Sequence, residues 1–150
     1  MSHSYVSNLL HYVFSTKERR PLITPDLQIR LFPYIGGIAR EHNMKLIAAG
    51  GVDDHVHILL SMQKTIGISK AMQLIKGGSS KWIHDTFPEH RLFEWQEGYG
   101  AFSIGISEVE RTVDYINRQA EHHKKQDFKS EFLGFLIKHE IEYDERYVFD

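Results

Sequence analysis

The sequence lacks cysteine altogether, which excludes disulfide bonds and cysteine-based metal sites. It also lacks any apolar run approaching the roughly 20 residues that a membrane-spanning helix needs. No basic segment precedes the first apolar stretch, so the N-terminal residues are not expected to form a signal peptide. These absences predict a protein without membrane association and with a cytoplasmic location.

A strong charge of either sign is also missing, since the formal net charge is -2. A small net charge neither indicates nor excludes a nucleic-acid partner, because a local basic face can be hidden in a neutral average. The chain has 150 residues, of which 41% are hydrophobic, and it shows no repeat or linker. This length and composition predict one globular domain over residues 1–150. Ten histidines are many for such a chain and justify a search for metal or acid–base chemistry.

Hydrophobic periodicity predicts the element order β-α-β-β-α-β followed by two helices. This order predicts an α+β fold of the ferredoxin-like, split βαβ type. Its antiparallel sheet would have helices on one face and leave the other face open, and C-terminal helices would be added to it. The expected strands are 4–16, 44–49, 55–62 and 93–104, and the expected helices are 25–42, 66–87, 107–125 and 128–139.

Local signals mark some of these helix boundaries. Thr24 followed by Pro25 is typical of a helix start, with threonine as the cap and proline at the first helical position. Ser107 and Glu110 have the spacing of a capping box. The pair Gly77-Gly78 predicts a soft point in the second helix.

The most informative local motif is His55-Val56-His57 within a predicted strand. Strand side chains alternate between faces, so both imidazoles are expected on one face and Val56 on the other. Two imidazoles so placed can bind one metal ion, although two histidines also occur at this spacing by chance on a partly wet strand. The preceding Asp53-Asp54 can orient a ligating imidazole or can simply form the turn.

Two imidazoles do not complete a metal site, so a third ligand is needed. On the predicted helix 107–125, Tyr115 and Gln119 are four residues apart and share one face. Gln119 can supply an oxygen ligand there, and Tyr115 can present its hydroxyl to a substrate. The alternative is a surface tyrosine that packs its ring and hydrogen-bonds through its tip. Imidazole, carboxamide and water ligands favour Mg²⁺ or Mn²⁺ as the metal.

The segments GGVDDHVHILL, WQEGYGAFSIG, VDYINRQAEHHKK and EYDERYVFD occur in this order along the chain. Together they resemble the single-tyrosine HUH transposases of the insertion-sequence-200-like (IS200/IS605-type) group. The short motif His-hydrophobic-His is weak alone, whereas the four segments in order are specific and span almost the whole chain.

The resemblance implies a DNA transposase that cleaves and rejoins single-stranded DNA by transesterification. It implies that His55, His57 and Gln119 bind a divalent metal, Mg²⁺ or Mn²⁺. It also implies that Tyr115 is the nucleophile that forms a 5′-phosphotyrosine and frees a 3′-hydroxyl. The implied partners are single-stranded DNA, with hairpins at the element ends, and a second copy of the chain in a homodimer with shared active sites. A domesticated relative that only binds single strands or hairpins would carry the same segments.

Basic side chains suggest where DNA would lie. Lys17, Arg19 and Arg20 cluster in a predicted loop, and Lys76 and Lys81 lie on the second predicted helix. Such residues neutralise phosphates, but they are equally typical of a solvated surface. The role of His122 and His123 beside the tyrosine stays open.

Three other functions are less well supported by the same residues. A histidine-triad hydrolase needs a third histidine at position 59, which is Leu59. A binding module on a ferredoxin-like sheet usually carries aromatic residues where His55 and His57 stand. A metal-dependent nuclease that uses water would form no covalent bond to DNA.

Overall fold

A four-stranded antiparallel sheet with strand order β2-β3-β1-β4 forms the centre of the protein. The computed structural model describes residues 3–149. This strand order and the helices between the strands confirm the predicted ferredoxin-like, α+β fold. The strands are β1 (Leu9–Ser15), β2 (Lys45–Gly51), β3 (His55–Ser61) and β4 (Gly100–Ile104).

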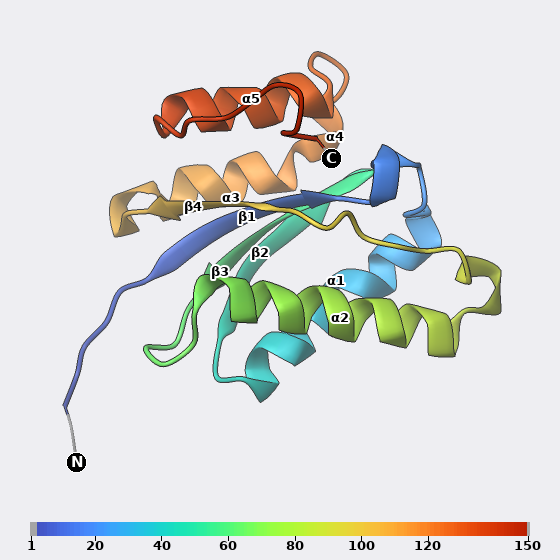
Figure 1. Cartoon of the computed structure of the whole chain (residues 1–150). Helices are drawn as coiled ribbons and strands as arrows, with labels where there is room; N and C mark the ends of the chain where they lie inside the picture. The colour runs from blue at the N-terminus through green and yellow to red at the C-terminus, as the bar shows by residue number, and fades with distance from the viewer. Residues whose placement is uncertain (1–2, 150) are drawn as a thin grey trace.

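Helices cover both faces of this sheet, so the molecule has three layers (Figure 1). One outer layer contains α1 (Pro25–Glu41) and α2 (Ile68–Thr86). The other contains the C-terminal helices α3 (Val109–Asn117), α4 (Gln119–His122) and α5 (Phe128–Lys138). The expectation of an open sheet face is therefore wrong. None of the helices in the described part of the chain is long and apolar enough to cross a bilayer.

Both sheet faces carry apolar side chains, which explains why both are covered. Tyr12 and Ile58 belong to the large core under α1 and α2. On the opposite face, Leu59 packs with Ile116 of α3, and Val13 packs with aromatic residues of α5. Alternation along β1 and β3 thus divides the apolar residues between two cores, and each buried side chain contributes about 1.5–3 kcal/mol.

The ends of the strands differ from the sequence-based expectation. β1 begins at Leu9 instead of Ser4, because Leu9 pairs with Ser61, the last residue of β3, and no strand continues beyond it. Of the residues before β1, those from position 3 onward run away from the body of the molecule (Figure 1). β4 begins at Gly100 instead of Phe93, and the stretch before it makes only an isolated bridge between Thr16 and Trp95.

The structure confirms the predicted start of α1 and contradicts two other helix predictions. The Thr24 hydroxyl accepts a hydrogen bond from the Leu27 N–H at 3.2 Å, which confirms the expected cap of α1. The expected soft point in α2 is wrong, since that helix runs without a break. Ser107 lies in the 3-10 turn η3 (Ile106–Glu108), so the proposed capping box is wrong. Its place is taken by Glu108, whose Oε1 accepts from the Gly105 N–H at 3.4 Å.

A close approach between backbones fixes α3 on the sheet. A Cβ atom added at Gly50 in β2 would lie 2.2 Å from the carbonyl oxygen of Ile116. Only glycine leaves room for this contact, so the backbone of α3 rests directly on β2. The two residues that the sequence singles out on this segment, Tyr115 and Gln119, flank the contact.

We predict that Gly50→Ala destabilises the protein by about 1–3 kcal/mol, because the methyl group must push α3 away from β2. The control is Gly77→Ala in α2, where an added Cβ meets no atom within 4 Å. That change should stabilise the fold slightly, since alanine favours a helix. Urea unfolding checks both variants, and a wild-type midpoint for Gly50→Ala would contradict the close contact.

Lys76 ties α2 to the segment that leads into β4. Its ammonium group donates to the carbonyl oxygens of Gln96 at 2.7 Å, Glu97 at 3.3 Å and Gly98 at 2.7 Å. It also lies over the ring of Phe14, 5.5 Å from the centroid. Burial lowers the pKa of Lys76 to about 8. Its expected contact with DNA phosphate would therefore compete with these three bonds.

We expect Lys76→Met to destabilise the fold by about 1–3 kcal/mol, because it leaves three carbonyl oxygens without their donor. Lys81→Met is the matched control on the same helix. Lys81 is exposed and pairs only with Asp85, at 2.6 Å, so its loss should leave the urea midpoint unchanged within error. Equal midpoints for the two variants would show that Lys76 has no structural role.

Candidate active site

His55 and His57 lie side by side on β3 and are fully buried. Both face the layer of C-terminal helices, whereas Val56 and Ile58 enter the core under α1 and α2. The alternation predicted from the sequence is therefore confirmed. The two ring centroids are 5.3 Å apart.

His55 is held between two oxygen atoms. Its Nδ1 lies 2.8 Å from Asp54 Oδ1, and its Nε2 lies 3.1 Å from Gln119 Oε1. An ionised carboxylate only accepts hydrogen bonds, so Nδ1 carries a proton and donates it to Asp54. At the other nitrogen, Nε2 faces a second acceptor. These two atoms could together hold a cation.

His57 is held in the same way by a histidine and a carboxylate. Its Nδ1 lies 2.8 Å from Nε2 of His11 on β1, and its Nε2 lies 3.0 Å from Glu131 Oε1. Burial and the neighbouring His57 lower the pKa of His11 to about 3, so His11 is neutral. Burial also lowers the pKa of His57, against the opposing effect of Glu131. In the contact seen here, His57 donates from Nε2 to Glu131, and its Nδ1 accepts from Nε2 of His11. The other neutral tautomer, with its proton on Nδ1, would instead present a lone pair at Nε2 to a cation.

Glu131 on α5 is the residue that the sequence analysis missed. It is only 4% exposed, and its Oε1 lies 3.5 Å from His55 Nε2 as well as near His57. Its Oε2 accepts hydrogen bonds from the Tyr115 hydroxyl and, at 3.3 Å, from Gln119 Nε2. Burial opposes the charge of this carboxylate, but the hydrogen bonds outweigh burial and hold the pKa of Glu131 below its usual range.

A signal for Glu131 does exist in the sequence. Phe128, Glu131, Phe132 and Phe135 are three or four residues apart, so the glutamate lies in the apolar stripe of α5. A carboxylate in such a stripe is rarely buried unless it is paired. Its spacing therefore identifies it as a site residue once α5 is known to face the sheet.

These donors fit a divalent cation. One ligand atom from each of His55, His57 and Glu131 can be chosen so that all three lie within 4.8 Å of one another. Gln119 Oε1 faces the same point beside His55 Nε2. Nitrogen and oxygen donors with one negative charge suit Mg²⁺, Mn²⁺ or Zn²⁺ in chemical terms. The carboxylate adds a charged ligand to the set predicted from the sequence.

Tyr115 is half-buried on α3 and reaches the same carboxylate from the side. Its ring centroid lies 5.7 Å from that of His57 and 4.4 Å from that of His122, on which it stacks. Burial, and then the contact with Glu131, raises the pKa of Tyr115 above its usual value. The phenol is therefore held protonated in this arrangement.

Gln119 follows a break in the helix that the sequence predicted to be continuous. Arg118 has φ -106° and ψ 24°, which ends α3 and starts the short helix α4. Tyr115 and Gln119 thus belong to different helices, yet both hydrogen-bond to Glu131. Their predicted convergence on one site does not depend on a straight helix.

His123 also lies at this site. Its ring centroid is 4.2 Å from that of His55, and its Nε2 is 3.5 Å from Glu131 Oε1. Burial lowers the pKa of His123, and the neighbouring His55 adds to this effect. Among residues 3–149, Nε2 of His123 and Nε2 of His122 are buried and neither has a partner at hydrogen-bond geometry.

The predicted DNA-contacting side chains lie in two places. Lys17 and Arg19 are in η1 (Lys17–Arg19). This turn follows the C-terminal end of β1, where Ser15 pairs with His55. Arg20 is exposed beside them, while Lys17 pairs with Glu94 at 3.4 Å and Arg19 lies over the ring of Phe149. The second group is on α2, which lies on the opposite face of the sheet from the C-terminal helices (Figure 1). Lys81 pairs with Asp85 there, and Lys76 is engaged as described above.

Known proteins resemble this chain in sequence and in fold. Residues 4–119 match the family described as "Transposase IS200 like". The transposase for insertion sequence element IS200 of Salmonella typhimurium is 25% identical over 130 residues, which cover 83% of this chain and 84% of that protein. The corresponding Salmonella typhi protein matches equally well.

Two solved structures share the fold. A candidate transposase from Deinococcus radiodurans R1 superposes with a TM-score of 0.62 at 19% identity, over 78% of this chain and 97% of its own. A REP-associated tyrosine transposase bound to a REP hairpin superposes with a TM-score of 0.56 at 18% identity, over 77% of this chain and 68% of its own.

The family match extends from the segment before β1 to Gln119 and so includes the two histidines of β3 and the tyrosine of α3. It covers well over half of the chain, and the fold agrees with it. The chain therefore belongs to the IS200-like transposase family.

Proposed function

We propose that the protein cleaves and rejoins single-stranded DNA through a covalent 5′-phosphotyrosine at Tyr115, with a divalent metal bound beside it. The observation that supports this most directly is the position of Glu131. One of its oxygens accepts from the Tyr115 hydroxyl, and the other lies 3.0 Å from His57 Nε2. A nucleophile and a set of metal-binding side chains thus meet at one buried carboxylate.

The reaction is a transesterification that keeps the number of phosphodiester bonds constant. The Tyr115 oxygen attacks the phosphorus, a bond forms between them, and the bond from phosphorus to O3′ breaks. The phenol loses its proton, and the departing O3′ gains one. The free 3′-hydroxyl can later attack the phosphotyrosine and reverse the exchange, so no nucleotide hydrolysis is needed. Covalent catalysis of this kind separates cutting from joining.

The residues around the tyrosine have distinct roles in this proposal. His55, His57, Gln119 and Glu131 would bind the cation, for which Mg²⁺ or Mn²⁺ is our choice. The cation supplies positive charge at the scissile phosphate and favours the phenolate over the phenol. Asp54 and His11 hold the two imidazoles through Nδ1, which turns Nε2 of each toward the site.

We further propose that the DNA is a hairpin-forming single strand. A REP-associated relative was solved bound to a REP hairpin, and its fold is similar to this one. Tyr115 contacts Glu131 of its own chain, which supports an active site assembled within one chain. The homodimer with shared sites that the sequence resemblance implies would require the C-terminal helices to exchange between subunits.

The covalent intermediate gives the first test. Single-stranded DNA from the flanks of the gene is incubated with Mn²⁺ or Mg²⁺ and run on a denaturing gel. We expect DNA labelled at its 3′ end to migrate with the protein, and 5′-labelled DNA to be released as a shorter fragment. Tyr115→Phe should abolish the adduct, because it removes the attacking oxygen but keeps the ring.

The control for this test is Tyr34→Phe on α1, which should leave the adduct unchanged. Metal-dependent cleavage without an adduct would favour a nuclease that uses water, and hairpin binding without cleavage would favour a domesticated binding protein. A mixture of Tyr115→Phe and His57→Ala chains distinguishes the two assemblies. An adduct that reappears in the mixture means sites shared between subunits, whereas its continued absence supports a site within one chain.

The metal site can be tested without DNA. We expect the protein to bind one equivalent of Mn²⁺, measured by electron paramagnetic resonance or calorimetry. His57→Ala removes a ligand and Glu131→Gln removes the negative charge, so each should weaken this binding by at least the roughly 10–100-fold that loss of an outer-shell partner costs. His3→Ala, at an exposed histidine far from β3 in sequence, is the control. Undiminished Mn²⁺ affinity in Glu131→Gln would mean that Glu131 orients Tyr115 and does not bind the metal.

A further inference from the structure

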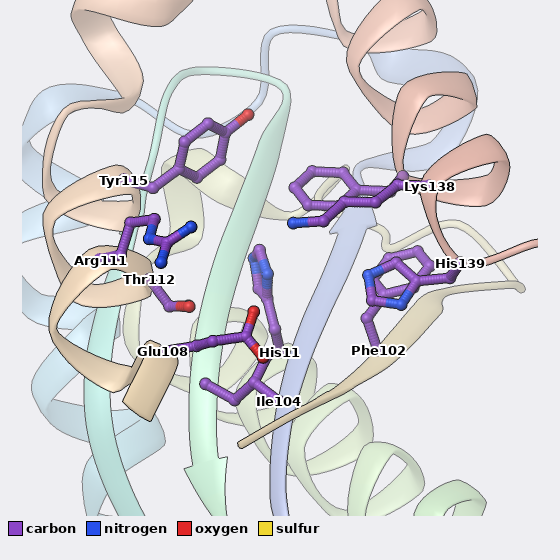
Figure 2. A pocket seen from close by; sticks show the side chains of 10 residues that line it. His11, Phe102, Ile104, Glu108, Arg111, Thr112, Tyr115, Lys138 and His139 are labelled. Carbon is purple, nitrogen blue, oxygen red and sulfur yellow. The ribbon is translucent and has the colours of Figure 1, made fainter. Parts of the chain in front are cut away.

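A small cavity opens directly beside Tyr115, between α3 and α5 (Figure 2). We propose that it binds the nucleotide on the 3′ side of the cleaved bond, the one that stays attached to the tyrosine. This inference rests on the proposed function, because it assigns one part of the DNA substrate to one part of the site. The volume of the cavity is about 160 Å³. Pockets for whole small molecules measure roughly 300–1,000 Å³, so a single nucleotide of a longer strand suits it better.

Two cations point into this cavity from facing helices. Arg111 on α3 and Lys138 on α5 extend toward each other across the gap (Figure 2). Both are exposed, and within residues 3–149 neither forms an ion pair. Glu108 at one end of the cavity supplies one negative charge, and its Oε1 accepts from the Gly105 N–H. The excess of positive charge favours a phosphate group.

Stacked rings form one wall of the cavity. Phe102 of β4 stacks on Phe135 of α5 and on His139, which directly follows α5, with centroid distances of 5.1 Å and 4.8 Å. The interplanar angles are 21° and 26°, so the Phe102 ring is stacked with each of the other two. Bases bind to such aromatic surfaces without strong sequence preference, because every base has a flat face. Cations and an aromatic wall together are the features that recognise a nucleotide.

The position of the cavity indicates which nucleotide it takes. Tyr115 lines the cavity, whereas His55, His57 and Glu131 do not. In a displacement at phosphorus, the attacking and leaving oxygens lie roughly in line on opposite sides. The nucleotide that departs with O3′ therefore leaves on the side away from the tyrosine oxygen. The nucleotide joined through O5′ remains on the phosphotyrosine, beside the ring of Tyr115.

The experiment uses substrates that lack one base. The cleaved bond is first mapped with labelled DNA, and an abasic site is then placed immediately 3′ or immediately 5′ of it. We expect the 3′ abasic site to slow adduct formation about tenfold, which is the usual effect of losing one stacked base, and the 5′ abasic site to have less effect. His139→Ala should remove most of this difference, and His139→Phe should restore it, since phenylalanine keeps the ring.

Two further variants test the cations. Arg111→Ala combined with Lys138→Ala should slow the adduct with intact DNA and reduce its dependence on salt. Arg40→Ala, at an exposed arginine on α1, should change neither property. If both abasic substrates react like intact DNA while the adduct still forms, the cavity does not bind this nucleotide and the proposed function stands.

If no DNA gives an adduct, the proposed function fails and the cavity is tested by binding alone. A 5′-phosphorylated trinucleotide pool is titrated into isotope-labelled protein and followed by NMR. Shifts concentrated at Arg111, Thr112, Lys138 and His139, and lost in the double variant, would support the cavity as a nucleotide site. Shifts absent from these residues would overturn it.

Discussion

The buried carboxylate of Glu131 is the interaction on which the C-terminal half of the structure depends. An ionised group without water costs several kcal/mol unless it is paired and hydrogen-bonded. Here one oxygen faces the imidazole of His57 and the other accepts from Tyr115 and Gln119. These bonds tie α5 to β3, α3 and α4 at one point. A cation that enters the site would therefore replace partners that the carboxylate already has, and its positive charge would compensate for the hydrogen bonds that are lost.

The second constraint is the contact between Gly50 and Ile116, which acts on the same helices from the other side. Because the backbone of α3 rests on β2, the tyrosine one residue before Ile116 is held at a fixed height above the sheet. His57 is opposite Gly50 in the pairing of β2 with β3. One glycine thus positions Tyr115 relative to the two histidines. The site thus combines histidines on the sheet with C-terminal helices that hydrogen bonds to Glu131 hold in place.

Much of this arrangement could be predicted from the sequence, because it follows from local periodicity. The alternation of His55, Val56 and His57 requires two imidazoles on one face, and the structure confirms this. Glu131 could not be predicted with the same reasoning, because its role depends on α5 folding back over β3, which no local pattern reports. The family match also ends at Gln119, before α5. Arg118 illustrates another limit, since neither glycine nor proline marks the break between α3 and α4.

The same contacts bear on how an active site could be shared between two chains. The C-terminal helices are joined to the sheet by the Gly50 contact and by the bonds of Glu131, so they would have to leave together to serve a partner subunit. Undocking of these helices from the sheet would expose the apolar surface of Leu59 and Ile116 and break the contact of Glu131 with His57. An equivalent set of contacts on the partner subunit would restore both the apolar packing and the partners of Glu131. Exchange of the helices therefore leaves the free energy of the final state unchanged and costs free energy only in the intermediate, where the helices are undocked. A barrier of this kind favours whichever arrangement forms first during folding, and the helices follow directly after β4 in the same chain. The proposed site within one chain therefore needs no such exchange, whereas a shared site requires every one of these contacts to form again on the partner.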